Sequence, residues 1–418
     1  MNLNWKRIAL IFGFLAVVVL IGYSLYFFFL KPTIPITNQP TNAINGSTGT
    51  LPQAGTNSNI KTTGNINGGL QGSEAIPGPP SQTKTETAAS ITATGGLTKT
   101  TALTNNRVYQ STLSGNGQNV IYYDKATGLF YQVGADGRST PYSDQVFYSV
   151  ETVYWSTDKT KAVMKFPDGA TILYDFATKK QTTLPSHWKD FDFSPNSQQM
   201  VFKSMGTSAD NRWLAIANAD GSGAQKIELL GDTDSTVYPS WSPNGQTIAM
   251  YTEDQSFDKQ NLYFIGKNSE NFKSTIVEGR GLQSQWSENG DRLLYSAYTS
   301  NNGYRPALWI VEAQGESIGQ NRKNLQLNTW ADKCTFSNND TVYCAVPTQL
   351  KEGAGIFYKE MDDVSCDIYK IDLVSGAKTK IAIPEGNQNI ETMMTSDDGK
   401  YLYFTSQANG KLYKINLK

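Results

Sequence analysis

Residues 241–251 read Trp-Ser-Pro-Asn-Gly-Gln-Thr-Ile-Ala-Met-Tyr, an aromatic residue and a turn followed by an alternating apolar run. Variants of this turn, an aromatic residue, Ser, any residue, Asn or Asp and often Gly, occur seven times. Their serines are 42, 38, 48, 45, 50 and 59 residues apart. The seven copies begin at Leu113, Trp155, Phe193, Trp241, Trp286, Phe336 and Thr395. A period in the forties with strand-like content is typical of four-stranded propeller blades. The repeat therefore predicts an all-β fold, a seven-bladed β-propeller.

The residues of the turn have local structural roles. Ser and Asn or Asp side chains cap backbone amides, Pro fixes φ at one corner, and Gly accepts a left-handed conformation. The aromatic residue before the serine lies on the first predicted strand, where we expect it to pack between neighbouring blades. We therefore interpret the seven copies as turn and core residues and not as ligand-binding motifs.

Residues 241–250, followed by Asn261-Leu262-Tyr263, resemble a blade of the TolB-like, WD-repeat-like β-propellers. The resemblance covers about residues 97–418 and is strongest in copies three, four, five and seven. Copy one departs from it with Leu113 in place of the aromatic residue, copy two with Lys159 in place of glycine, and copy six is one residue shorter. The resemblance implies the fold and leaves the function open, because TolB-like blades occur in periplasmic scaffolds and in the lids of prolyl oligopeptidases.

The seventh copy reaches Lys418 after only three predicted strands. Residues 97–104, Leu-Thr-Lys-Thr-Thr-Ala-Leu-Thr, resemble the fourth strands of other copies, such as residues 180–184. We expect this N-terminal strand to complete the last blade and to close the ring, because closure protects the exposed edges of the sheets. The propeller is therefore assigned to residues 97–418.

A transmembrane signal anchor is predicted at residues 8–30, an uncharged apolar run of 23 residues. As a helix this run is about 35 Å long, enough to span a hydrocarbon core of about 30 Å. It is too long for a cleaved signal peptide and ends in bulky residues. Lys6 and Arg7 precede it and Lys31 follows, so the positive-inside rule places residues 1–7 in the cytoplasm and the propeller outside it.

Residues 31–96 are predicted to form a disordered linker. They are rich in Thr, Asn, Gly, Ser and Pro, and they bury too little apolar surface to offset their conformational entropy. A flexible tether of this length suits a globular domain held away from a membrane.

Composition and motifs give little support to an enzyme or to a nucleic-acid-binding protein. The net charge is −1 with no basic stripe, so we expect no nucleic-acid partner. The single histidine, His187, has no second histidine to help it to bind a metal, and neither a Gly-x-Ser-x-Gly nor a phosphate-binding motif occurs. Asp232 with Asp234, and Asp362 with Asp363, are weak candidates for calcium. We expect no catalytic residue, no cofactor and no metal site.

The three cysteines lie in the sixth repeat. Cys334 and Cys344 flank the shortened turn and are candidates to pair across a hairpin, while Cys344 with Cys366 is the competing pair. An exported compartment permits either disulfide, and three free thiols are the remaining alternative.

The connections between second and third strands are predicted to be long in blades three to six and short in the others. The long ones span residues 204–211, 252–259, 297–305 and 347–365. Because connections of one kind emerge on one face of a propeller, and loops on rigid scaffolds concentrate recognition residues, this rim is the candidate interaction surface. Its expected exposed anchors are Phe257, Tyr298, Tyr304, Phe357 and Tyr358.

The sequence thus predicts a membrane-anchored, extracytoplasmic propeller that is a non-catalytic binding or scaffolding module of the cell envelope. Its expected partner is an envelope protein or glycan. The alternative is a propeller that binds a glycan or small ligand in its central channel, as a sensor or as an accessory to an enzyme.

Overall fold

The computed structural model describes Leu20 and residues 88–268, 270, 272–358 and 364–418. The described residues from 88 onward all belong to one compact unit. Apart from Leu20, the predicted membrane span lies outside the described residues, as does the linker up to residue 87. In the portion of the chain that is described, no helix has the length and hydrophobicity needed to cross a membrane.

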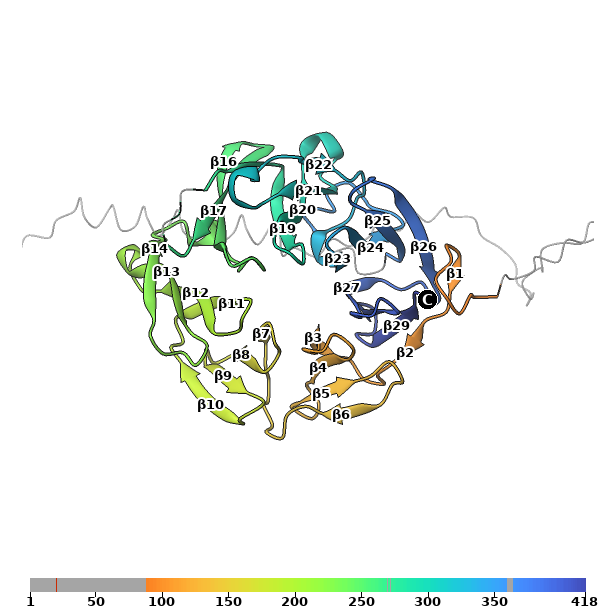
Figure 1. Ribbon diagram of the computed structural model, residues 1–418, viewed down its shortest axis with the longest axis horizontal. Helices are drawn as coiled ribbons and strands as arrows, with labels where there is room; N and C mark the ends of the chain where they lie inside the picture. The colour runs from red at the N-terminus through yellow and green to blue at the C-terminus, as the bar shows by residue number, and fades with distance from the viewer. Residues whose placement is uncertain (1–19, 21–87, 269, 271, 359–363) are drawn as a thin grey trace, which may run out of the picture. The chain divides into compact units, whose positions relative to one another are not determined.

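The described residues from 88 onward form a ring of seven β-sheets, almost wholly antiparallel (Figure 1), which confirms the predicted seven-bladed propeller. The first strand of each blade lies toward the centre of the ring. Blade one contains β3 (Tyr109–Leu113), β4 (Val120–Asp124), β5 (Leu129–Val133) and β6 (Ser139–Pro141), and blade two contains β7 (Thr152–Trp155), β8 (Lys161–Lys165), β9 (Thr171–Asp175) and β10 (Lys180–Leu184). Blade three contains β11 (Trp188–Phe193), β12 (Gln199–Met205), β13 (Arg212–Asn218) and β14 (Gln225–Leu229). Blade four contains β15 (Val237–Pro239), β16 (Thr247–Ser256), β17 (Lys259–Gly266) and β18 (Thr275–Glu278).

Blades five and six contain β19 (Arg280–Trp286), β20 (Arg292–Tyr298), β21 (Pro306–Glu312), β22 (Lys323–Asn324); and β23 (Cys334–Asn338), β24 (Thr341–Pro347), β25 (Cys366–Asp372), β26 (Lys378–Pro384). Blade seven contains β27 (Ile390–Thr395), β28 (Tyr401–Ser406), β29 (Leu412–Asn416) and β2 (Thr101–Ala102). Short 3-10 helices lie in the connections: η2 (Ala209–Asn211), η3 (Asp234–Thr236), η4 (Ser300–Asn302), η5 (Gly315–Ser317) and η6 (Ala331–Lys333).

The N-terminal segment contributes to two blades. β2 pairs with β29 in antiparallel fashion and supplies the fourth strand of blade seven. β1 (Leu97–Thr98) instead pairs in parallel with β26 and adds a fifth strand to blade six. The expectation of one continuous strand over residues 97–104 is therefore wrong, because this segment passes from the edge of one blade to the edge of the next.

The ordered contacts begin a few residues before the expected start of the propeller. Ala93 donates its N–H to the carbonyl of Asn416 at 2.9 Å, and Gly95 donates its N–H to the carbonyl of Ile381 at 2.7 Å. Residues of the predicted linker thus join blades six and seven.

The repeated serine organises the turn between the first and second strands. In blade four, Ser242 Oγ donates to Asn244 Oδ1 at 2.7 Å and accepts the N–H of Thr247 at 2.9 Å. The same two bonds occur at Ser114, Ser156, Ser194 and Ser396. They explain why Ser and Asn or Asp recur two residues apart, since together they satisfy buried backbone groups of the turn.

Two of the copies vary from this pattern. In blade five, Ser287 donates to Asp291 Oδ1 at 2.7 Å and still accepts the N–H of the following strand. In blade six the turn is shorter, and Asn338 pairs directly with Thr341. Turn residues also join neighbouring blades; for example, Asn244 donates to the carbonyl of Gly290 at 2.7 Å.

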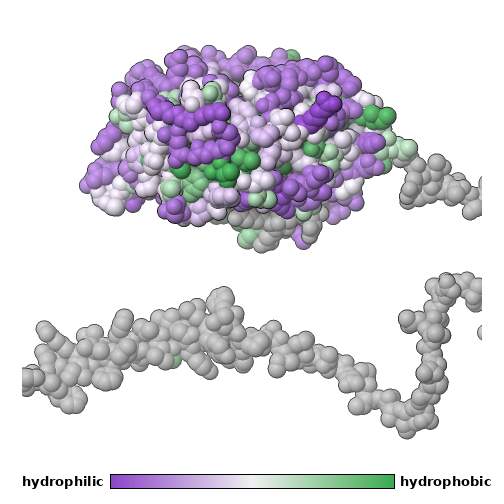
Figure 2. Space-filling model, turned by 90° about the horizontal axis from the view of Figure 1, so that it is seen from below, coloured by the Kyte–Doolittle hydropathy of each residue, from purple (hydrophilic) through white to green (hydrophobic). Residues whose placement is uncertain are grey.

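The core consists of apolar side chains between blades, with many aromatic rings. Phe130 of blade one, for example, packs edge-on against Trp155 and Phe176 of blade two, with ring centroids 5.4 and 5.3 Å apart. Seen from one side, the described surface is mostly hydrophilic and hydrophobic residues gather only in small areas (Figure 2). Because exposed apolar residues are few, each one at the surface is a candidate for contact with a partner.

Candidate interaction surface

The connections between second and third strands share one face of the ring with those between a fourth strand and the next blade, because antiparallel strands alternate in direction. On this face, the blade 4–6 loop layer comprises residues 254–258, 299–305 and 348–358. It coincides with three of the four connections that the sequence predicts to be long. The segment 252–259 differs from the prediction, because most of it extends β16 and β17 as a tight hairpin instead of forming a loop.

Two of the five predicted aromatic anchors are exposed. Phe257 lies at the tip of the β16–β17 hairpin with 67% of its surface accessible, and Phe357 is 55% accessible. The expectation of exposure is wrong for Tyr298, Tyr304 and Tyr358, which are half-buried within the layer. The rings of Tyr298 and Tyr304 contact each other edge-on with centroids 6.4 Å apart, so they support the loops from below.

Arg280, the first residue of β19 in blade five, holds the hairpin of blade four. Its Nε donates to the carbonyl of Phe257 at 2.8 Å, and its Nη2 donates to the carbonyl of Ser256 at 2.8 Å. Its Nη1 forms an ion pair with Asp254, and this hydrogen bond lowers the pKa of that carboxyl group. One guanidinium group therefore contacts three residues of the hairpin and holds Phe257 at a defined place.

The glycines on either side of Arg280 permit this approach. Gly279 has φ +125° and Gly281 has φ +67°. A Cβ atom at Gly279 would lie 2.9 Å from the carbonyl carbon of Tyr298, and one at Gly281 would clash with the ring of the same tyrosine. The sequence signal for this arrangement is Gly-Arg-Gly at the start of a first strand, which the predicted rim did not include.

Further hydrogen bonds extend the loop layer across blades five and six. Ser300 donates its N–H to Asp258 Oδ1 at 3.0 Å and links blade five to blade four. Toward blade six, Gly353 donates its N–H to the carbonyl of Gly303 at 2.9 Å, and Gly355 donates to that of Tyr304 at 2.7 Å. The three segments thus form one connected surface and not three independent loops.

Tyr358 anchors the blade-six part of this layer. Its ring packs edge-on against the buried Trp330 with centroids 4.7 Å apart, and its hydroxyl donates to Asp332 Oδ2 at 3.2 Å. Desolvation raises the pKa of Tyr358 and that of Asp332. The buried Lys333 donates to the carbonyl of Ile390 in blade seven and lies 5.6 Å from the centre of the Tyr358 ring. Burial and these contacts give the layer a rigid base.

Three exposed apolar residues of this face were not predicted. Ile356, next to Phe357, is 47% accessible. Val146 and Tyr148 lie in the connection between blades one and two, and both approach Gly128 in the neighbouring connection. Val146 and Tyr148 lie outside the connections between second and third strands from which the rim was predicted, and Ile356 lies within one of them but is not aromatic.

A small cavity lies between the first strands of blades seven and one. Its volume is about 240 Å³, and its lining residues are Arg107, Val108, Tyr109, Gln110, Ser111, Glu391, Thr392 and Thr405. It combines a guanidinium group, a carboxylate and several hydroxyl groups, which are the groups that a small polar ligand requires. This cavity is relevant to the alternative prediction, in which the propeller binds a glycan or small ligand in its central channel.

The aspartates that the sequence offers as weak candidates for calcium include two that lie beside an arginine. Asp232 and Asp234 both lie beside Arg212, whose Nη1 is 3.3 and 3.4 Å from their carboxylates. His187 is exposed and Asp362 and Asp363 lie outside the described residues. Across the described segments of the chain, no group of three or more His, Cys, Asp or Glu side chains is arranged to hold a metal ion.

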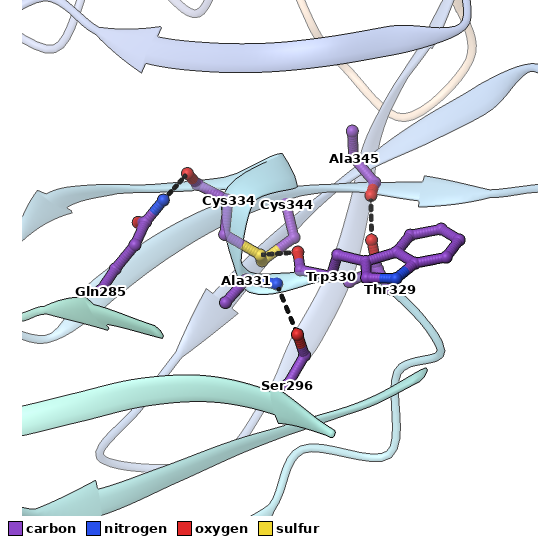
Figure 3. The surroundings of a disulfide bond; sticks show 8 residues. All are labelled: Gln285, Ser296, Thr329, Trp330, Ala331, Cys334, Cys344 and Ala345. Atoms are coloured by element: carbon purple, nitrogen blue, oxygen red, sulfur yellow. Dashed lines mark hydrogen bonds between the residues drawn. A yellow bond between two sulfur atoms is a disulfide. The ribbon is translucent and has the colours of Figure 1, made fainter. Parts of the chain in front are cut away.

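Cys334 and Cys344 form a disulfide, and Cys366 is a buried free thiol. The two bonded cysteines are directly opposite in the β23–β24 pair, with Cα atoms 4.1 Å apart. Figure 3 shows the disulfide beside η6, whose Ala331 N–H donates to Ser296 Oγ at 3.1 Å. The hairpin pairing, one of the alternatives left open by the sequence, is therefore the one present.

The chain is similar in fold to solved β-propellers. No protein-family model and no curated protein matches it. An oligogalacturonate lyase in complex with manganese is 13% identical with a TM-score of 0.53, over 76% of this chain and 93% of that one. The oligogalacturonate lyase of Vibrio parahaemolyticus is 12% identical with a TM-score of 0.51, over 76% and 93%. The Cps50 (Swd1) β-propeller domain of Myceliophteria thermophila is 10% identical with a TM-score of 0.50, over 76% and 100%.

At these identities the similarities show the fold alone. They place the chain among the β-propellers, in agreement with its seven sheets. The TolB-like resemblance remains a prediction, because no family model matches. Propellers of one architecture have many functions, so a function has to be argued from the surface of this chain.

Proposed function

We propose that this protein is a membrane-anchored, extracytoplasmic β-propeller that binds an envelope protein through its blade 4–6 loop layer and has a scaffolding, non-catalytic role. The observation that carries the proposal is the connection of the three loop segments into one surface with exposed Phe257 and Phe357. A preorganised surface loses less conformational entropy on binding than free loops do, and large apolar side chains at its centre supply most of the binding energy. A stable partner needs about 800 Å² on each side, which several adjoining loops can provide.

The anchor and the location belong to the same proposal. The apolar run at residues 8–30 and the basic residues before it support an N-terminal anchor with the propeller outside the cytoplasm. The Cys334–Cys344 disulfide is compatible with an oxidising compartment.

The test is capture of partners from solubilised envelopes with the full-length protein. The double variant F257A/F357A removes the two exposed rings without touching the hydrogen bonds that hold the loops. We expect it to lose the partner that the wild-type protein retains, while melting at the same temperature.

The matched control is V374A. Val374 is 75% accessible and lies in the turn after the third strand of blade six, on the opposite face. Its loss is expected to leave capture unchanged. Undiminished capture by F257A/F357A, or equal loss with V374A, would contradict binding through the loop layer.

The cavity between blades seven and one supports a second candidate, in which the propeller binds a small glycan near its centre. Its Arg107 and Glu391 are the polar groups that such a ligand would contact. Glycan-array binding that R107A abolishes and F257A/F357A leaves intact would favour this candidate over the first.

A further inference from the structure

A second surface feature lies on the side of the ring, between blades three and four. It is a groove of about 580 Å³ between β14 on one side and β16 and β17 on the other, which are neighbours at the left of Figure 1. Its apolar lining residues are Ile227, Leu229, Leu230, Val237, Tyr251, Phe264 and Ile265. Leu229 is 49% accessible, so the apolar surface of the groove is open to solvent.

The groove is left open because the fourth strand of blade four is short. β18 pairs only with residues 259–262 of β17. Among the described residues, no strand pairs with the outer edge of residues 263–266. Residues 264–266 of this half of β17 form one side of the groove, and Glu270 lies against Gly266. In blade two, by contrast, the fourth strand pairs with the full length of the third.

The groove is also acidic. Three carboxylates line it, those of Glu228, Glu253 and Glu270, and its lining contains no lysine or arginine. Within the described chain, none of the three forms an ion pair with a basic side chain. Tyr263 donates its hydroxyl to Glu253 Oε2 at 3.0 Å, which orients that carboxylate. Burial, and after it the charges of Glu253 and Glu228, raise the pKa of Tyr251.

An open apolar groove with unneutralised carboxylates is complementary to a chain that alternates apolar and basic side chains. We propose that this groove binds an extended polypeptide segment of a partner, with apolar side chains against Tyr251, Ile265 and Leu229 and lysine or arginine side chains beside Glu228 and Glu253. The charges select the partner and the apolar contacts hold it. This site is separate from the blade 4–6 loop layer and does not depend on the function proposed above.

The test measures the fluorescence anisotropy of labelled synthetic heptapeptides with the full-length protein in detergent. The probe is Gly-Lys-Val-Lys-Val-Lys-Gly, and the two comparison peptides replace every lysine with glutamate or every valine with glycine. We expect the probe to bind more tightly than both. Binding should weaken when the salt concentration rises from about 50 mM to about 500 mM, because the charged groups are at the surface.

Two double variants separate the groove from general electrostatic attraction. E228Q/E253Q is expected to raise the dissociation constant of the probe about two- to thirtyfold, the range for two exposed ion pairs. E151Q/E385Q makes the same change of charge at exposed glutamates of blades two and six and is expected to have no effect. L229S should weaken the valine-containing probe and leave the glycine-containing peptide unchanged.

The proposal is overturned if the glutamate peptide binds equally well, if E228Q/E253Q binds the probe as the wild type does, or if both double variants weaken it equally. It is also overturned if the probe does not bind and the protein instead self-associates in sedimentation velocity through Glu228 and Glu253, since the occupant would then be a second copy of the chain.

Discussion

The carboxylate of Asp192, in the first strand of blade three, accepts the backbone N–H of Trp241 in blade four at 2.6 Å. Its other oxygen accepts the N–H of Phe193 at 2.9 Å. The side chain of Asp192 thus links two blades whose strands are not paired with each other through backbone hydrogen bonds. Desolvation raises its pKa to about 6, although these two N–H groups and the charge of Lys159 act in the opposite direction.

This pKa predicts a specific pH dependence of stability. Between about pH 4 and 6 the folded protein keeps a proton on Asp192 that the unfolded chain has released, so the contribution of this group falls as the pH rises through that window. D192N stays neutral at every pH, but its amide oxygen can accept only one of the two N–H groups, so we expect it to be less stable than the wild type near pH 4. This deficit should shrink near pH 7.5 by at most about 3 kcal/mol, because only the wild type loses stability as Asp192 ionises. Urea unfolding at both pH values measures this; an equal difference at both would contradict the assignment.

The serine of the repeated turn is predicted to stabilise the propeller in six of the seven copies, the exception being the shortened turn of blade six. S242A removes both bonds of Ser242 Oγ and leaves the buried N–H of Thr247 without that partner. An unsatisfied buried donor costs about 1–3 kcal/mol. The matched control is S337A in the shortened turn, where Asn338 pairs directly with Thr341 and the serine hydroxyl forms neither bond within the described blade. Thermal unfolding of the two variants should separate them clearly, and equal losses would refute this role.

Arg280 is predicted to control local order more than global stability. R280A removes the donors to Ser256 and Phe257 and the ion pair with Asp254, all at the surface. We expect faster amide hydrogen exchange in residues 254–258 with a melting temperature close to that of the wild type. R138A, at an exposed arginine of blade one, serves as the control and should leave exchange in this hairpin unchanged. Unaltered exchange in R280A would show that the hairpin is ordered without it.

The thiol content gives a direct check of the disulfide. The native chain should react with no more than traces of iodoacetamide, because Cys366 is buried and desolvation raises its pKa. After unfolding without reductant, one thiol per chain should become available, and after reduction three. Peptide mapping should identify the single thiol as Cys366; labelling of Cys334 before reduction would show that the pairing is different.

The part of this structure that could be predicted is the part that repeats. Each copy of the turn carries its own Ser and Asn or Asp, so a local pattern identifies it without knowledge of the neighbouring blades. Asp192 and Arg280 could not be identified in this way, because their partners, Trp241 and Phe257, belong to another copy and depend on how the blades are placed. The groove has the same origin, since its two sides come from β14 and β17.

The candidate interaction surface shows the same limit. Loop length along the sequence pointed to one face of the ring, and Phe257 and Phe357 are exposed on that face. Aromatic character alone could not separate them from Tyr298 and Tyr358, whose rings pack beneath the surface. Exposure depends on contacts made by glycines and by Trp330, which a single sequence does not reveal.

The N-terminal pairing also determines how the propeller responds to mechanical force. The chain enters the folded body at Ser90, passes through β1 on blade six and then reaches β2 on blade seven. Tension applied from the N-terminal side therefore loads the hydrogen bonds of Ala93 and Gly95 first, then the parallel β1–β26 pair, before it reaches the β2–β29 pair that closes the ring. A chain pulled at this end would resist through two short strands in series, so the sheet edge next to the tether, and not the disulfide-linked hairpin of blade six, is the first element to yield.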